Sequence, residues 1–154
     1  MKKLIFVVLL SFCSTQAVEV IDSPPIDNSK LQNTSPLSIT YENELGELVN
    51  EDLTNKQTLI VFWADYWGIC REELPLLEKN LKKLSETYDV IALAHSDVDP
   101  TMEWVENNLV GNLTIGFSTS ELRDQLQVVG QPISIIFDTN GNIISREFGY
   151  IPTN

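Results

Sequence analysis

The chain has 154 residues, of which 43% are hydrophobic and 21% charged, and these proportions fit one globular domain with a sizeable core. Its 22 acidic side chains outnumber 10 basic ones and give a formal charge of −12, so nucleic acid and anionic membrane surfaces are unsuitable partners. One histidine and two cysteines do not make the ligand cluster of a metal site, and no glycine-rich phosphate loop is present, so we expect neither a metal nor a cofactor.

The first seventeen residues have the pattern of a secretory signal peptide. Lys2 and Lys3 form a basic start, residues 4–10 form an apolar run, and a small-residue cleavage site ends at Ala17. The apolar run is far shorter than the roughly 20 residues that a membrane-spanning helix needs. The sequence therefore predicts a signal peptide over residues 1–17, cleaved after Ala17, and an exported mature protein.

Cys13 suggests a weaker alternative, in which the protein is a lipoprotein. The residues before Cys13 loosely resemble a lipid-attachment motif, but Phe12 stands where that motif requires a small residue. If cleavage instead follows Ala17, Cys70 becomes the only cysteine of the mature chain. A lone cysteine in an exported protein indicates an intermolecular partner, a reactive thiol or a buried structural residue.

Residues 18–36 contain three prolines and lack a sustained apolar period, which is typical of an extended tether. The folded domain is therefore predicted to span residues 37–154. It begins with a β-hairpin, because residues 37–41 alternate between apolar and polar side chains and residues 47–49 follow a turn at Gly46.

The rest of the domain alternates between strands and helices. Residues 58–63 form an apolar run typical of a buried strand, and apolar side chains recur at helical spacing on one face of residues 70–88. Further elements follow in chain order: a strand over residues 90–94, a helix over residues 100–108 capped by Asp99, an extended piece over residues 113–117, a helix capped by Ser118 or Thr119 through Leu126, and a hairpin formed by residues 133–137 and 143–146. This order predicts an α/β domain.

The tetrad Trp67-Gly-Ile-Cys70 lies between the first buried strand and the helix that follows it. The surrounding phrase FWADYWGICREELP, residues 62–75, closely resembles the active-site signature of the periplasmic thioredoxin-like thiol-disulfide oxidoreductases of the TlpA, ResA and CcmG type. In that family the pattern reads roughly F-W-A-x-W-C-x-x-C-R-x-E-x-P. With the early hairpin and the loop around Pro132, the resemblance covers residues 37–149. It implies a thioredoxin-like fold, with a mixed sheet flanked by helices and an N-terminal β-hairpin, and a periplasmic location.

The sequence stops soon after the predicted final hairpin. Members of this family usually continue into a C-terminal helix that covers one face of the sheet, and that helix is missing here. An uncovered apolar face favours association. We therefore expect a partner or a dimer at this face, unless the reading frame is truncated.

Trp67 stands where the resembling family carries the first cysteine of its dithiol site. That cysteine lies exposed at a helix start, which stabilises its thiolate, and it makes the first attack on a disulfide. An indole cannot form a mixed disulfide. The resemblance therefore implies that dithiol exchange is lost at this site.

Cys70 matches the second cysteine of the family, which is shielded. Two alternatives stay open for it: a small buried structural residue, or a monothiol that reacts with an external disulfide or an oxidant. Peroxiredoxins place their reactive cysteine at about this position, but they carry a proline and a threonine where this chain has Trp63 and Trp67. Peroxide reduction is therefore the weaker form of the monothiol hypothesis.

Three further residues are assigned through the resemblance. Glu73 matches an acidic residue associated with proton handling and partner recognition, but without a first thiol the sequence favours a role in complementing the helix dipole. Pro132 matches a loop proline that follows a cis peptide bond and lies against the active site. The resemblance thus implies a cis bond after Gln131, and a backbone edge at residues 131–133 that pairs with an extended peptide.

We interpret the chain as an exported thioredoxin-like protein that binds a protein or peptide segment at the groove near Trp67, Gln131 and Pro132. The partner could be a thiol-containing periplasmic protein. The alternative is a monothiol oxidoreductase that works through Cys70, with Glu73 handling the proton.

Overall fold

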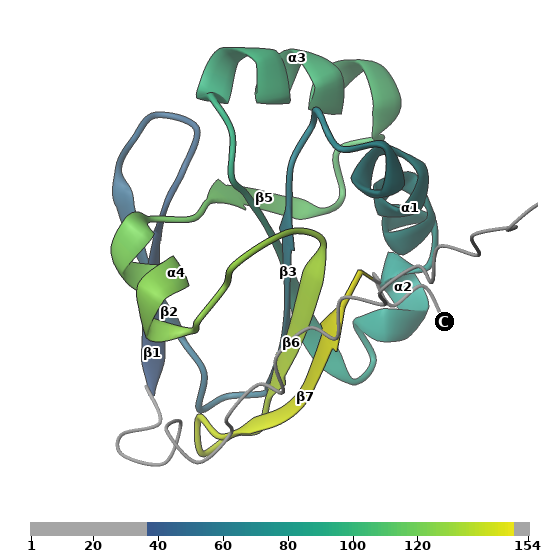
Figure 1. The fold of residues 1–154 in the computed structure, drawn as a ribbon. Coiled ribbons are helices and arrows are strands. Elements are labelled where there is room, and N and C mark those ends of the chain that lie inside the picture. Colours follow the sequence, from purple (N-terminus) through teal and green to yellow (C-terminus); the bar gives the residue numbers. More distant parts are fainter. Residues whose placement is uncertain (1–36, 150–154) are drawn as a thin grey trace, which may run out of the picture.

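The computed structural model describes residues 37–149, which Figure 1 draws in colour. The predicted signal peptide over residues 1–17, the possible lipid site at Cys13, the predicted tether over residues 18–36 and the chain after Gly149 lie outside the described residues. Cleavage, lipidation and the missing C-terminal helix therefore stay predictions.

Seven strands of the described chain form one mixed sheet. They are β1 (Ser38–Glu42), β2 (Leu48–Asp52), β3 (Gln57–Trp63), β4 (Tyr88–Ala94), β5 (Thr114–Phe117), β6 (Ile133–Phe137) and β7 (Ile143–Phe148). Their order in the sheet is β2-β1-β5-β4-β3-β6-β7 (Figure 1). The central strands β5, β4 and β3 are parallel, and hairpins β1–β2 and β6–β7 add antiparallel pairs at the two edges. The predicted α/β class, mixed sheet and N-terminal hairpin are confirmed.

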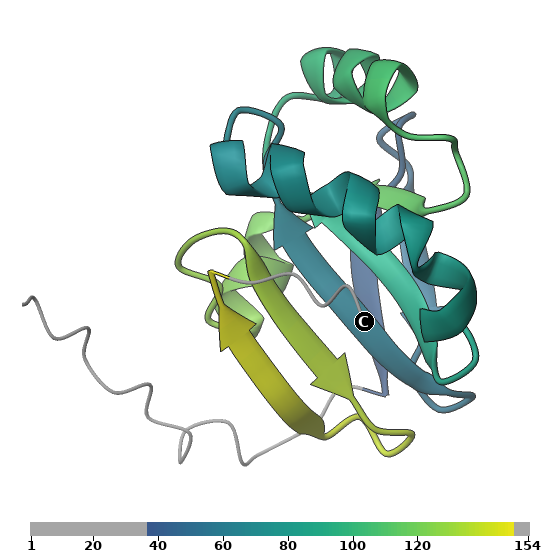
Figure 2. The same ribbon diagram turned by 90° about the vertical axis from the view of Figure 1, so that its right-hand side faces the viewer.

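Helices cover both faces of the sheet. They are α1 (Gly68–Lys79), α2 (Leu81–Leu84), α3 (Val98–Asn108) and α4 (Ser120–Gln125). The first three lie on one face and α4 on the other (Figures 1 and 2). In β3, Leu59, Val61 and Trp63 are buried in the first layer, and Ile60 and Phe62 in the second. A strand that is covered on both faces reads as a continuous apolar run, which explains the unbroken pattern of this segment.

The face of β6 and β7 on the side of α1 is covered by no helix of the described part of the chain (Figure 2). Ile136 of β6 packs at the margin of the core on this side and is only half-buried. The prediction that a partner or a second copy covers such a face stays a prediction.

The single helix predicted over residues 70–88 is wrong. The structure has α1 followed by the short α2, and Tyr88 is the first residue of β4. The interruption lies at Asn80, whose side-chain amide donates to the carbonyl of Leu76 at 2.9 Å while its backbone N–H reaches the same oxygen at 3.1 Å. This cap ends α1 before the periodic apolar pattern ends.

The predicted start of the third helix is also wrong. Helix α3 begins at Val98 rather than at Pro100, so Asp99 lies in its first turn, where a carboxylate complements the helix dipole, and does not cap it. The cap predicted for α4 is confirmed, because the Thr119 hydroxyl accepts the N–H of Leu122 at 3.1 Å.

Candidate functional site

The predicted site lies where β3 ends and α1 begins, at the carboxyl ends of the central parallel strands (Figure 1). Trp67 is the N-cap residue of α1, with an extended backbone and no side-chain cap hydrogen bond. Its N–H donates to the carbonyl of Ala64 at 3.2 Å, and its own carbonyl accepts the N–H of Arg71 at 3.1 Å. Trp67 is 47% exposed. An apolar ring therefore faces solvent at the position where a dithiol site would begin its attack.

Cys70 is fully buried and belongs to the same core cluster as Trp63 and Leu74. It is a free cysteine. Burial raises the pKa of the Cys70 thiol, a backbone hydrogen bond from Ala64 acts against this rise, and the charge of Glu73 adds to it. The thiol is thus protonated at neutral pH and covered, whereas nucleophilic cysteines are exposed thiolates.

Glu73 is half-buried in α1, and its effect on the pKa of Cys70 places its charge within electrostatic reach of the sulfur. His95 is different, because its side chain is exposed after the end of β4 and makes no hydrogen bond to Cys70 among the described contacts. Partial desolvation of the ring and the positive charge of Arg123 lower the pKa of His95. Of these two titratable groups, only Glu73 acts on the thiol.

The loop before β6 contains the cis peptide bond between Gln131 and Pro132 that the resemblance implies. Pro132 is buried, and its carbonyl accepts the N–H of Gly149 at 2.8 Å. Ile133 already pairs with Phe62 of β3 and with β7. The edge expected over residues 131–133 is therefore reduced to Gln131, whose backbone groups make no hydrogen bond within the described chain.

Tyr66 connects this loop to the rest of the site, a role that sequence reasoning missed. The side-chain amide of Gln131 donates to the Tyr66 hydroxyl at 3.0 Å, and that hydroxyl lies 3.5 Å from the carbonyl oxygen of His95. Tyr66 is 59% exposed. The only signal in the sequence is a tyrosine where the resembling pattern has a tryptophan, because a phenol adds a hydroxyl that an indole lacks.

Exposed apolar side chains occur in the same loop, at the end of β7 and in the turn into α1. Phe148, at the end of β7, lies over Gly130, since a Cβ atom added to that glycine would meet the Phe148 ring at 3.0 Å. We call the following set of exposed side chains the apolar rim: Tyr66, Trp67, Ile69, Val129 and Phe148. An exposed apolar cluster of this kind is typical of an interaction surface.

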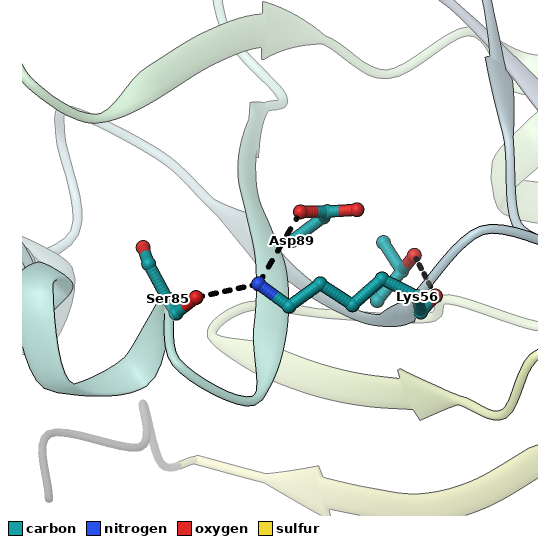
Figure 3. Close-up of polar contacts among 4 residues, drawn as sticks. Lys56, Ser85 and Asp89 are labelled. Carbon is teal, nitrogen blue, oxygen red and sulfur yellow. Dashed lines mark hydrogen bonds and ion pairs between the residues drawn. The ribbon is translucent and has the colours of Figure 1, made fainter.

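A separate cavity of about 280 Å³ lies at the opposite end of the sheet, between β2, α2 and the starts of β4 and β5. Lys56 lies near it, donating to the carbonyl of Ser85 and lying 3.7 Å from the carboxylate of Asp89 (Figure 3). Burial and the charges of Asp89 and Asp52 raise the pKa of Glu51, another wall residue. Strand β4 spans about 20 Å between this cavity and His95, so the cavity is independent of the apolar rim.

The residues that the structure describes offer no metal site and no membrane span. Among residues 37–149, no group of three or more His, Cys, Asp and Glu side chains could hold a metal ion. In the same range, no helix is long and apolar enough to cross a bilayer.

Comparisons with known proteins identify the fold. No protein-family model matches the sequence, and no curated protein matches it. Among solved structures, the chain is similar to DsbF of Mycobacterium tuberculosis, with a TM-score of 0.65 and 20% identity over 78% of this chain and 92% of that one. It has a thioredoxin-like fold.

Two further structures agree with this. A putative thiol:disulfide interchange protein DsbE from Chlorobium tepidum has a TM-score of 0.65 and 22% identity, covering 78% of this chain and 86% of its own. An exposed lipoprotein thioredoxin from Streptococcus pneumoniae has a TM-score of 0.62 and 18% identity, covering 75% and 92%. The fold that the active-site phrase predicted is therefore confirmed.

Proposed function

We propose that this protein is an exported relative of the thiol-disulfide oxidoreductases that has lost dithiol exchange and binds an extended protein segment at the apolar rim. The observation that carries the proposal is the contrast between Trp67 and Cys70. The first is an exposed indole at the position of the attacking cysteine, and the second is a fully buried thiol. The thioredoxin-like fold and the phrase over residues 62–75 support the relationship.

The rim and the loop beside it provide what an extended segment needs. The backbone N–H and carbonyl of Gln131 have no partner among the described residues, so they can pair with one residue of a bound strand. Phe148, whose ring lies over Gly130, and Trp67, which follows the Gln131 partner Tyr66 in the chain, are exposed and can bury side chains of that strand. Neither contact requires a thiol.

Export is part of the same proposal. The pattern of residues 1–17 predicts a signal peptide. One of the similar structures is that of an exposed lipoprotein. Both support a location outside the cytoplasm, where disulfide-bonded proteins are the potential partners.

Monothiol exchange through Cys70 is the second candidate, and the hydrogen bond from the Ala64 backbone favours it because it stabilises the thiolate. In that reaction Glu73 would take the thiol proton and the Cys70 sulfur would attack one sulfur of a partner disulfide. One mixed disulfide forms, the partner's S–S bond breaks, and its other sulfur leaves as a thiolate that regains a proton.

Thiol labelling separates the two candidates. In the full chain carrying Cys13→Ser, Cys70 is the only thiol. The binding proposal expects a disulfide reagent to label Cys70 only after unfolding in urea, with the Cys13→Ser, Cys70→Ser double variant as the blank. Native labelling faster than that of a free peptide thiol, with turnover by a reductant, would refute the loss of exchange.

Binding is tested with a fluorescein-labelled peptide of alternating valine and threonine. We expect saturable binding that Trp67→Ala weakens about tenfold, as for a central aromatic anchor. Leu48→Ala is the matched control, because Leu48 is an even more exposed apolar residue on the edge strand β2, away from the rim. Equal affinity of the Trp67→Ala protein and the wild type would contradict the proposed site.

A further inference from the structure

Three segments of the chain meet at the Tyr66 hydroxyl. Tyr66 lies in the turn between β3 and α1, Gln131 lies in the loop before β6, and His95 follows β4. The hydroxyl accepts a hydrogen bond from the Gln131 amide at 3.0 Å and can donate to the His95 carbonyl at 3.5 Å. We propose that Tyr66 is a positioning residue of the binding site, which holds Gln131 so that its backbone is presented to a bound strand. This inference rests on the proposed function.

Gln131 belongs to a short exposed stretch between two anchored residues, since Val128 before it is buried with its N–H bonded to the carbonyl of Arg123 at 2.8 Å. After it, Pro132 is buried and bonded to Gly149, and β6 begins. Before it, Val129 is 89% exposed, and the Phe148 ring over Gly130 is the neighbouring contact. The bond to Tyr66 therefore ties the exposed half of the loop to the core strands.

The hydroxyl, rather than the ring, carries this role. Tyr66 is 59% exposed, so its ring adds little to core packing, whereas its oxygen joins the Gln131 side chain to the backbone carbonyl of His95. A loop that is already held in its binding conformation loses less conformational entropy when a ligand binds. Removing the hydroxyl should thus weaken binding without changing the apolar surface of the rim.

Tyr66→Phe tests this in the full chain, with two measurements. In the free protein, the backbone order parameters from 15N NMR relaxation should fall at residues 130–131, because the side-chain bond to Tyr66 is lost and no backbone hydrogen bond of the described chain holds these residues. The affinity for the valine–threonine peptide should fall about three- to tenfold, the loss expected for one hydrogen bond. Tyr88→Phe is the matched control, since it removes a hydroxyl at the opposite end of β4 and should change neither measurement.

Gln131→Ala completes a double-mutant cycle. If the hydroxyl acts through the Gln131 side chain, Tyr66→Phe should have little further effect on peptide affinity in the Gln131→Ala background. Peptide binding that Tyr66→Phe leaves unchanged would overturn the positioning role while the proposed function stands. No peptide binding by the wild-type protein would overturn both.

Discussion

Glu78 offers the sharpest test of how the helix layer is attached to the sheet. It is a buried carboxylate in α1, and its two oxygens accept the backbone N–H groups of Val110 at 2.7 Å, Asn112 at 2.8 Å and Leu113 at 3.4 Å. These three groups belong to the connection between α3 and β5. One side chain thus satisfies the donors of a loop that has no regular structure of its own.

Glu78→Gln keeps the shape of the side chain but replaces one accepting oxygen with an NH₂ group. At least one short charge-assisted bond is lost and a donor then faces a donor, which should cost about 2–3 kcal/mol of unfolding free energy. At roughly 4 °C per kcal/mol for a domain of this size, the melting temperature should fall by about 8–12 °C.

Thermal unfolding followed by circular dichroism measures the effect of Glu78→Gln. Glu72→Gln is the control, because Glu72 is an exposed carboxylate on the same helix. A melting temperature for Glu78→Gln within about 2 °C of the wild-type value would mean that the three hydrogen bonds do not hold the loop.

Three other outcomes follow from the structure. Burial, chiefly, raises the folded-state pKa of Glu51. The folded protein therefore binds this proton more tightly than the unfolded chain does, and the resulting stabilisation is lost as the pH rises through the folded-state pKa. Glu51→Gln should raise the urea midpoint at pH 7 but not at pH 3. Partial desolvation and the charge of Arg123 lower the folded-state pKa of His95 below the usual histidine value of 6.5, so stability should fall as the pH drops below 6.5. His95→Gln should flatten this dependence between pH 7.5 and 5.5 in urea titrations. Trp67→Cys should create a pair three residues apart with Cys70 at a helix start and restore dithiol reduction of insulin; a folded, inactive protein with two titratable thiols would contradict this.

The sequence predicts the central part of the fold well because its signals there are local. The apolar run of β3 reflects burial on both faces, and the final hairpin has an Asp-Thr-Asn-Gly turn in which Asp138 accepts the N–H groups of Asn140 and Asn142. The end of α1 was not predictable from periodicity. Its apolar spacing continues past Asn80, whereas the helix stops where the Asn80 side chain bonds the carbonyl of Leu76.

The site was predicted only in part, for a similar reason. Trp67, Cys70 and Pro132 follow from the resemblance of one phrase and one loop, but the contacts of Tyr66 and Glu78 join segments far apart in the chain. Glu78 did leave a signal, since it is a charged residue directly after Leu77 on the apolar face of its helix. A buried charge there requires partners, but sequence alone does not say that they are backbone groups of a distant loop.

Trp67 and Cys70 together determine which chemistry is possible without rearrangement. An attack by the Cys70 sulfur on a disulfide requires the first turn of α1 to open, because the thiol is fully buried. An opening that costs about 3–5 kcal/mol slows that attack by roughly 10²–10⁴, and the raised pKa of the thiol lowers the reactive fraction further. The apolar rim is exposed without any opening. A strand bound there would also lie against Trp67 and oppose the opening of the first turn of α1. Segment binding and monothiol exchange should therefore exclude each other. The valine–threonine peptide should slow labelling of Cys70.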